Sequence, residues 1–191
     1  MKTYIILLRG VMPFGKNKVP MADLRRELVQ AGLKDVQTYI QTGNVIATSN
    51  LSQVKLEQQV HDTIKNMIDG NITVIARTSK QFNNILKSNP FQDIDTSKLY
   101  FSLLASHPDL EQLKTFFSIN FSPDKVCVIE DVIYTLYATK LSDSKFTNNY
   151  FESKLKVKAT TRNFNTMSKL VQLSTQAEKA GLKKIYPYLT S

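Results

Sequence analysis

The sequence has a single cysteine, Cys127, and no tryptophan. One cysteine cannot form an intramolecular disulfide, and its place in an apolar run that begins at Val126 predicts a buried, unreactive thiol. The only histidines, His61 and His107, do not form a metal-binding motif. No apolar run reaches the roughly 18 residues of a membrane span, and no signal-peptide-like segment follows the first residue. We therefore expect a soluble, untargeted, cytoplasmic protein with no membrane partner, no metal and no cofactor.

Acidic residues are in short supply, because 16 Asp and Glu face 25 Lys and Arg, which gives a formal net charge of +9. Residues 96–139 hold three Lys against five acids, whereas residues 140–191 hold nine Lys and one Arg against three acids. Such an excess favours contact with nucleic acid or with a phosphorylated ligand. A solvated surface on an alkaline protein explains the same charge, so both interpretations stay open.

The most apolar segment near the start is Tyr4–Leu8, which ends in Arg9 and Gly10. Five consecutive apolar residues predict a strand that is buried on both faces, with Arg9 at its carboxyl end. Ligands of open α/β sheets commonly bind at that edge. The carboxyl end of this strand is therefore the first candidate site.

The loop after this strand has the Gly10-x4-Gly15-Lys16 spacing of a nucleotide-binding P-loop. Asn17 stands where a P-loop has the Ser or Thr that holds magnesium, and Pro13 removes an amide that would bind phosphate. A hairpin follows the next helix instead of a parallel crossover. These differences argue against a P-loop.

Apolar periodicity in both halves of the chain predicts the same order of elements, β-α-β-β-α-β. The first half has the strand above, a helix from Pro20 that stops at Gly32, strands 35–41 and 44–49 around Thr42-Gly43, a helix ending at 69–70 and a strand over 72–76. The second half has strand 99–105, helix 110–117, strands 125–130 and 132–138, a helix around 146–151, strand 157–160 and a last helix that ends at Gly181.

This order predicts an α+β fold with two ferredoxin-like β-α-β-β-α-β subdomains in tandem, followed by a C-terminal helix. The polar run that starts at Ser88-Asn89-Pro90 separates them, so we expect an N-terminal subdomain over 1–90 and a C-terminal one over 98–191. A structural duplication is indicated, although no residue-level identity between the halves is visible in the sequence.

Polar clusters that lie at the predicted strand ends and turns share a donor-rich character. Guanidinium, ammonium, amide and hydroxyl groups stand beside glycines that allow close backbone approach, a combination suited to phosphate or carboxylate oxygens. The candidate ligand-binding residues are Arg9, Lys16, Asn17, Gln41, Asn44, Lys145, Thr161, Arg162 and Asn163.

A structural role explains several of these residues equally well. Gly43 and Asn44 fit the turn of a hairpin, and Asn163 or Asn165 fits the cap of the last helix. In this interpretation the arginines and asparagines hold the two halves together, and no ligand binds.

Enzymatic activity is left open by the sequence. No pair of carboxylates appears at the polar clusters, so two-carboxylate acid/base chemistry has no visible site. An enzyme that acts on a small phosphorylated or carboxylated metabolite through positioning and electrostatic stabilisation is one alternative. RNA binding on the sheet face is disfavoured because the first strand has only Tyr4 as an aromatic and strand 44–49 has none.

These clusters also resemble a known family, the bacterial domain of unknown function numbered 1697. The resemblance runs essentially end to end and rests on Tyr4-x3-Leu8-Arg9-Gly10, Gly15-x-Asn17, Thr38-Tyr39-Ile40-Gln41-Thr42-Gly43-Asn44-Val45, Ser144-Lys145 and Ala159-Thr160-Thr161-Arg162-Asn163-Phe164-Asn165-Thr166. It implies a duplicated ferredoxin-like α/β fold without an established activity. The family motif carries over to Arg9, Gly10, Gly15, Asn17, Gln41, Gly43, Asn44, Lys145, Thr161, Arg162, Asn163 and Asn165.

The first loop departs from the family pattern. Relatives typically have Gly-Ile-Asn-Val-Gly-Gly where this chain has Gly10-Val11-Met12-Pro13-Phe14-Gly15, so apolar or rigid groups replace a polar amide and a flexible glycine. Our leading hypothesis is a binding protein whose two subdomains face each other around a phosphate-bearing ligand. The expected ligand is a nucleotide or nucleic acid, held at a basic, amide-rich cleft between the subdomains.

Overall fold

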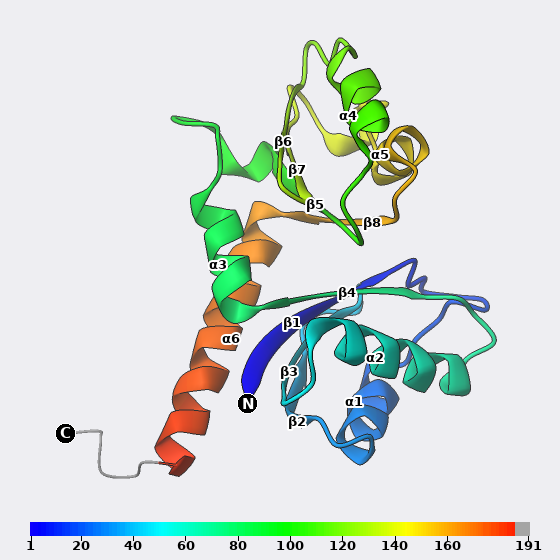
Figure 1. The fold of residues 1–191 in the computed structure, drawn as a ribbon, viewed down its shortest axis with the longest axis vertical. Helices are drawn as coiled ribbons and strands as arrows, with labels where there is room; N and C mark the ends of the chain where they lie inside the picture. Colours follow the sequence, from blue (N-terminus) through cyan, green and yellow to red (C-terminus); the bar gives the residue numbers. More distant parts are fainter. Residues whose placement is uncertain (186–191) are drawn as a thin grey trace. The chain divides into compact units, whose positions relative to one another are not determined.

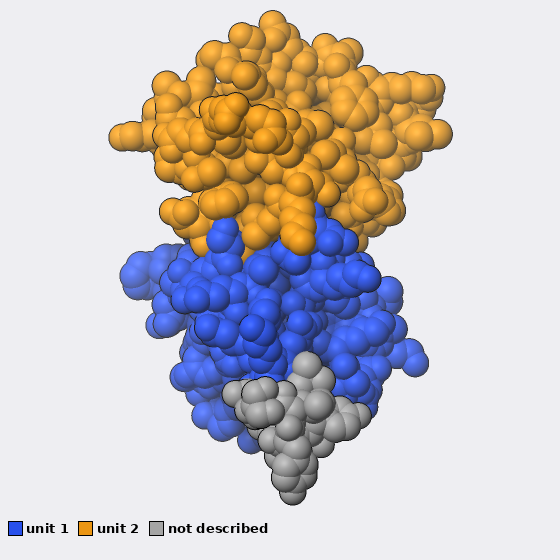
Figure 2. All heavy atoms as spheres, turned by 90° about the vertical axis from the view of Figure 1, so that its left-hand side faces the viewer, with its two compact units in different colours: residues 1–84, 168–191 blue, residues 85–167 orange. Residues whose placement is uncertain are grey.

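The computed structural model describes residues 1–185, with side chains described up to residue 181. The chain divides into two compact units, with residues 1–84 and 168–191 in unit 1 and residues 85–167 in unit 2 (Figure 2). Each unit holds one four-stranded antiparallel sheet, and the described residues form six α-helices (Figure 1). The predicted mixture of α and β structure is therefore confirmed.

Unit 1 is built on an antiparallel sheet with the strand order β2-β3-β1-β4. Its elements are β1 (Lys2–Arg9), α1 (Met21–Gln30), β2 (Lys34–Thr38), β3 (Asn44–Ser49), α2 (Gln53–Met67), β4 (Thr73–Thr78) and the first part of α3 (Ser79–Lys87). The last helix, α6 (Phe164–Ile185), joins this unit from residue 168 onward.

Strand β1 is the central element of unit 1, because residues 4–8 are all almost completely buried. Its alternate side chains Tyr4, Ile6 and Leu8 pack in one apolar core with α1 and α2. Helix α1 contributes Met21, Leu24 and Leu28 to this core, at helical spacing. The intervening residues, among them Ile5 and Leu7, point to the other face and are equally buried.

Unit 2 repeats this arrangement with the strand order β6-β7-β5-β8. Its core is aromatic: Phe116 contacts Phe151 edge to face, with ring centroids 5.9 Å apart, and Phe121 contacts Phe146 in the same way at 4.9 Å. Its strands and α-helices are β5 (Leu99–Leu104), α4 (Leu110–Phe117), β6 (Lys125–Ile129), β7 (Val132–Leu136), α5 (Asn148–Leu155) and β8 (Ala159–Asn163). It also has two short 3₁₀ helices, η1 (Thr96–Lys98) and η2 (Leu141–Asp143).

The two sheets match residue by residue in their central strands. Tyr4 pairs with Ala47 and Thr78, and Tyr100 takes the same position between Thr135 and Asn163. The matching strand segments read Tyr-Ile-Ile-Leu-Leu in β1 and Tyr-Phe-Ser-Leu-Leu in β5. The structure thus shows a residue-level correspondence that the sequence alone had not revealed.

The second helices of the two units also match. Helix α2 begins after the cap Ser52 with Gln53, and α5 begins after the cap Thr147 with Asn148. In each case the fifth helical residue is a glutamate. Oε1 of Glu57 accepts a hydrogen bond from the Ala76 amide at 2.7 Å, and Oε1 of Glu152 accepts one from the Ala159 amide at 2.8 Å.

A third match lies at the ends of β4 and β8, where an arginine precedes the residue that caps the next helix. Nη1 of Arg77 donates to the Ala76 carbonyl at 2.7 Å, and Nη1 of Arg162 donates to the Thr161 carbonyl at 2.8 Å. The side chain of the next residue, Thr78 or Asn163, then accepts a hydrogen bond from the amide three positions later. Arg77 and Arg162 are therefore equivalent residues of the two units.

Several element boundaries differ from prediction, and two of them are explained by local chemistry. Helix α6 continues through Gly181 to Ile185, because one glycine in a helix interior costs only about 1 kcal/mol relative to alanine. Strand β2 ends at Thr38 instead of residue 41, since residues 39–43 form a longer turn that the Asn44 side chain closes.

The last helix also joins a different unit from the one expected. We expected it to accompany residues 98–191, whereas its part after residue 167 packs in unit 1. There Ser174 Oγ lies 3.0 Å from Ser79 Oγ, and both side chains are buried. Helical periodicity predicts an apolar face but does not tell which core that face enters.

No helix within residues 1–185 is both long enough and apolar enough to span a membrane. The cytoplasmic location stays a prediction.

Candidate functional site

The predicted site residues of the first half gather at one edge of the unit 1 sheet, where β1 ends. Leu7 pairs with Asn44 at the start of β3, and Arg9 pairs with Thr73 at the start of β4. The loop 10–19, the turn 39–43 and the loop before β4 therefore meet there. We call this region the β1 edge.

Asn17 holds the loops of the β1 edge together. Its Nδ2 donates to the Gly10 carbonyl at 3.1 Å, and its Oδ1 accepts from the Asn71 amide at 3.3 Å. Any Cβ added to Gly70 would overlap the Asn17 Oδ1 and the Lys16 carbonyl. Both ends of the Asn17 amide group are thus in use, which indicates a structural role for this residue.

Asn44 plays the same part in the turn. Its side chain is fully buried, and its Nδ2 donates to the Tyr39 carbonyl at 3.1 Å and to Thr42 Oγ1 at 3.0 Å. The adjacent Gly43 accepts a hydrogen bond from the Leu8 amide at 2.8 Å, which attaches the turn to β1. The structural interpretation of Gly43 and Asn44 thus has direct geometric support.

Ile40 adopts an unusual backbone conformation in this turn, with φ at 49° while its side chain is exposed. A β-branched residue in the left-handed region is strained by roughly 1–3 kcal/mol. Such strain often accompanies a binding surface, because stability alone would favour another residue.

Replacing Ile40 with glycine is expected to raise the free energy of unfolding by about 1 kcal/mol, since the strain disappears and little packing is lost. Ile40→Asn should give a similar gain, because asparagine tolerates this conformation. Denaturant unfolding measures both variants. A loss of stability in both would show that the turn is not strained at Ile40.

Lys16 and Gln41 remain as exposed donors at the β1 edge, and Arg9 is half-buried beside them at the end of its strand. Lys16 Nζ lies 3.3 Å from Asp69 Oδ2, but the lysine side chain is 78% exposed. An ion pair in that setting contributes little to stability. Lys16 therefore keeps its charge available to an anionic ligand at small cost.

The predicted residues of the second half lie around the start of α5 and the end of β8 in unit 2. Thr161 Oγ1 donates to Asn148 Oδ1 at 2.9 Å and lies 2.7 Å from Ser102 Oγ. Asn163 caps α6 by accepting from the Thr166 amide at 2.9 Å. Lys145 is exposed, with its ammonium 5.1 Å from the centre of the Phe146 ring. Only Lys145 of this set is exposed to solvent.

Arg162 is engaged within its own strand. In addition to its carbonyl contact, its Nη1 donates to Thr160 Oγ1 at 2.8 Å. Burial lowers the pKa of Arg162 to about 10, so the guanidinium remains protonated at neutral pH. Because Arg77 occupies the equivalent place in unit 1, the simplest role of Arg162 is to end the strand and start the helix. The expected meeting of the first-half and second-half residues stays a prediction.

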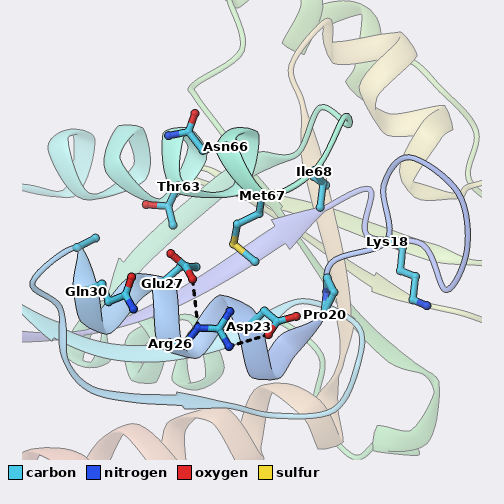
Figure 3. Close-up of a pocket in the computed structure, with 11 residues that line it drawn as sticks. Lys18, Pro20, Asp23, Arg26, Glu27, Gln30, Thr63, Asn66, Met67 and Ile68 are labelled. Carbon is cyan, nitrogen blue, oxygen red and sulfur yellow. Dashed lines mark hydrogen bonds and ion pairs between the residues drawn. The ribbon is translucent and has the colours of Figure 1, made fainter.

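A cavity of about 620 Å³ lies between α1 and α2 of unit 1, and none of the nine predicted residues lines it (Figure 3). Arg26 lies in it between Asp23 and Glu27, at 3.0 and 3.3 Å from their carboxylate oxygens. Lys18 adds a second cation, so the charges of the lining residues balance. A cavity with balanced charge gives a phosphate no particular advantage.

A second cavity, of about 740 Å³, lies at the opposite end of the unit 1 sheet, beside the first residues of β1 and part of α6. Lys2, Lys34 and Lys80 line it together with Asp35 and Glu178. Its excess of one positive charge is small. The part of the chain that the structure describes contains no group of three His, Cys, Asp or Glu side chains that could hold a metal ion.

Sequence reasoning missed the exposed apolar side chains of the β1 edge, which are Met12, Phe14 and Ile40. Phe14 is 81% exposed. An available signal was their position, since each lies in a predicted turn where a buried side chain has no core to enter.

Comparison with known proteins gives a family but no activity. No curated protein matches the chain. The solved structure of the conserved bacterial protein SP0830 from Streptococcus pneumoniae is similar, with 25% sequence identity, a TM-score of 0.76 and coverage of 92% of this chain and 99% of that one. The model of the family described as protein of unknown function DUF1697 matches residues 1–134. The chain therefore belongs to the DUF1697 family, as its motifs predict.

Proposed function

We propose that this protein binds a phosphate-bearing ligand, a nucleotide or a nucleic acid, at the β1 edge of unit 1. The residues that would contact the ligand are Arg9, Lys16 and Gln41, with Asn17 and Asn44 shaping the loops that carry them. Arginine, lysine and amide groups are suited to phosphate oxygens.

The observation that carries the proposal is that Arg9, the cation at the end of β1, has no cationic counterpart in unit 2. In the matched registers Arg9 corresponds to Ala105. Features that both units share, such as Arg77 and Arg162, are explained by the fold. A feature that is present in only one unit needs another reason, and ligand binding supplies one for Arg9, which is half-buried beside the exposed Lys16 and Gln41.

The distribution of charge supports the same unit. Residues 1–84 and 168–191 contain 15 Lys and Arg against seven Asp and Glu, whereas residues 85–167 contain ten against nine. The formal excess is thus +8 in unit 1 and +1 in unit 2. A polyanion would be attracted to unit 1 by this long-range field.

The remaining predicted residues favour a structural role. Thr161 and Asn163 are hydrogen-bonded within unit 2, and Arg162 repeats the contacts of Arg77. We propose that they stabilise the strand-to-helix connection. The shared strand order and the matched glutamates further support the proposal that the two units are tandem ferredoxin-like repeats.

Charge reversal at Lys16 tests the proposed function. Fluorescence anisotropy with a labelled oligothymidylate, and competition by ATP, should show binding to the wild type that Lys16→Glu weakens at least fivefold. The slope of log Kobs against log salt should decrease in magnitude by about 0.7 for one lost phosphate contact.

Lys114→Glu in unit 2 is the matched control for this variant. The Lys114 side chain is 73% exposed, it pairs with Glu111 as Lys16 pairs with Asp69, and its reversal changes the net charge equally. It should leave affinity nearly unchanged. Equal losses in the two variants, or a wild type that binds neither oligonucleotide nor ATP, would contradict the proposal.

A further inference from the structure

We propose that the ligand is a single-stranded nucleic acid and that one of its bases stacks on Phe14. This inference rests on the proposed function and names the ligand class of the same site. It concerns the tip of the loop that follows β1, whose side chains make no part of the core.

The loop holds Phe14 outward because its base is closed and anchored. The Met12 amide donates to the Asn17 carbonyl at 3.0 Å, and the Lys18 amide donates to the Gly15 carbonyl at 3.1 Å. Asn17 fixes this base to Gly10 and Asn71. Pro13 restricts the backbone just before the ring, so little entropy is lost when a ligand orders the tip.

Phe14 belongs to a group of exposed apolar side chains. Met12 lies on the same loop, and Ile40 lies on the neighbouring turn, which touches the loop where Val11 meets Gly43. Single exposed apolar residues are common on protein surfaces. Two adjoining turns expose three of them, one in a strained backbone conformation, and these three side chains lie outside the apolar core.

Positive charge surrounds this apolar tip. Lys16 is exposed within the closed six-residue loop 12–17, half of which spans roughly 10 Å at most, and the exposed Lys18 directly follows this loop. An aromatic ring beside lysines is the combination that binds single strands, since the ring stacks on a base and the lysines contact phosphates. A duplex keeps its base faces stacked inside and would offer Phe14 no surface.

A membrane surface is the competing partner for an apolar, basic loop. Interfacial binding depends on a large buried apolar area, as an amphipathic helix provides. The β1 edge offers three side chains with Gln41 and Thr42 exposed among them. These polar neighbours suit base edges and phosphates better than acyl chains.

The absence of tryptophan from the chain allows a direct test. Phe14→Trp places the only tryptophan of the chain at the tip and should preserve stacking. Phe117→Trp is the matched control, because Phe117 is an exposed phenylalanine of unit 2 at 61%. Titration with unlabelled oligothymidylate should quench the tryptophan at position 14 and leave the one at 117 unchanged.

Affinity measurements separate stacking from charge. Phe14→Ala should weaken binding of a labelled oligothymidylate about tenfold and leave binding of an abasic strand of equal length unchanged. Phe117→Ala should match the wild type with both probes. All these side chains are exposed, so the variants should unfold as the wild type does.

The inference fails if Phe14→Ala binds oligothymidylate as tightly as the wild type, or if it loses affinity equally for the abasic strand. It also fails if phosphatidylglycerol vesicles, but not oligothymidylate, change the emission of the tryptophan at position 14. In each of the first two cases the wild type still binds the strand, so the proposed function survives. A wild type that binds neither oligothymidylate nor ATP removes the proposed function itself.

Discussion

Replacing Gly43 with alanine is expected to lower the free energy of unfolding by about 3 kcal/mol. The glycine has φ at 78°, a conformation that strains any residue with a Cβ. The added Cβ would lie 2.7 Å from Leu8 Cβ and 2.9 Å from Val11 Cγ2. Leu8 Cβ is fixed by the backbone of the buried central strand, so the turn itself must move.

Gly15→Ala is the control, because Gly15 also has φ at 78° while no atom lies within 4 Å of an added Cβ. It should lower the free energy of unfolding only by the strain of a Cβ at positive φ, about 1–2 kcal/mol. The difference between the variants in denaturant unfolding therefore measures the contact of the turn with β1. Equal losses would mean that the turn is not fixed against β1.

Glu57→Ala is expected to destabilise the protein by about 3 kcal/mol or more, and Glu152→Ala by about 1–3 kcal/mol. Both variants remove the acceptor of a buried strand amide. Each glutamate also has a cation whose nitrogen lies 3.7 Å from a carboxylate oxygen, and these cations differ in burial. The side chain of Arg77, beside Glu57, is 6% exposed, whereas that of Lys158, beside Glu152, is 64% exposed. Loss of the glutamate charge should therefore reduce stability more beside the buried guanidinium of Arg77 than beside the solvated ammonium of Lys158.

Glutamine at the same positions separates the contribution of the amide hydrogen bond from that of the negative charge. Glu57→Gln and Glu152→Gln keep an oxygen that can accept the amide hydrogen bond but remove the charge. Glu152→Gln should thus be nearly neutral, whereas Glu57→Gln should retain much of the loss measured for Glu57→Ala. The account of the repeated glutamates would be contradicted if Glu152→Ala cost more than Glu57→Ala.

Local patterns predicted the elements that local chemistry determines. The apolar run of residues 4–8 became the buried strand β1, and Gly32, with φ at 93°, follows the end of α1. The turn after β2 was predicted in the correct place, but it is longer than predicted. Its length depends on a side-chain hydrogen bond from Asn44 to Tyr39, which a period-two pattern does not reveal.

Correspondence between the units could not be predicted because it depends on register. Tyr4 and Tyr100 become equivalent only when both are paired with their neighbouring strands. Likewise, Arg162 was predicted to bind a ligand because it lies in a cluster rich in hydrogen-bond donors. Its equivalence to Arg77 appears only in the hydrogen bonds that both make.

For the candidate residues of the first half, the sequence indicated their common place more clearly than their contacts. The carboxyl end of β1 does gather Arg9, Lys16, Asn17, Gln41 and Asn44. From the sequence, the amides of Asn17 and Asn44 were predicted to donate hydrogen bonds to a ligand. In the structure they form hydrogen bonds that hold the loops together. Sequence reasoning overlooked Phe14 because an apolar residue in a loop is not a recognisable motif.

The most direct test of the account is a titration of ¹⁵N-labelled full-length protein with oligothymidylate, followed by amide chemical shifts. Binding at the β1 edge predicts shifts concentrated in residues 12–17 and 40–43, with those of Arg26 and Thr63 in the α1–α2 cavity and of Lys114 unchanged. Shifts centred on Arg26 and Thr63, or no saturable shifts at all, would contradict it.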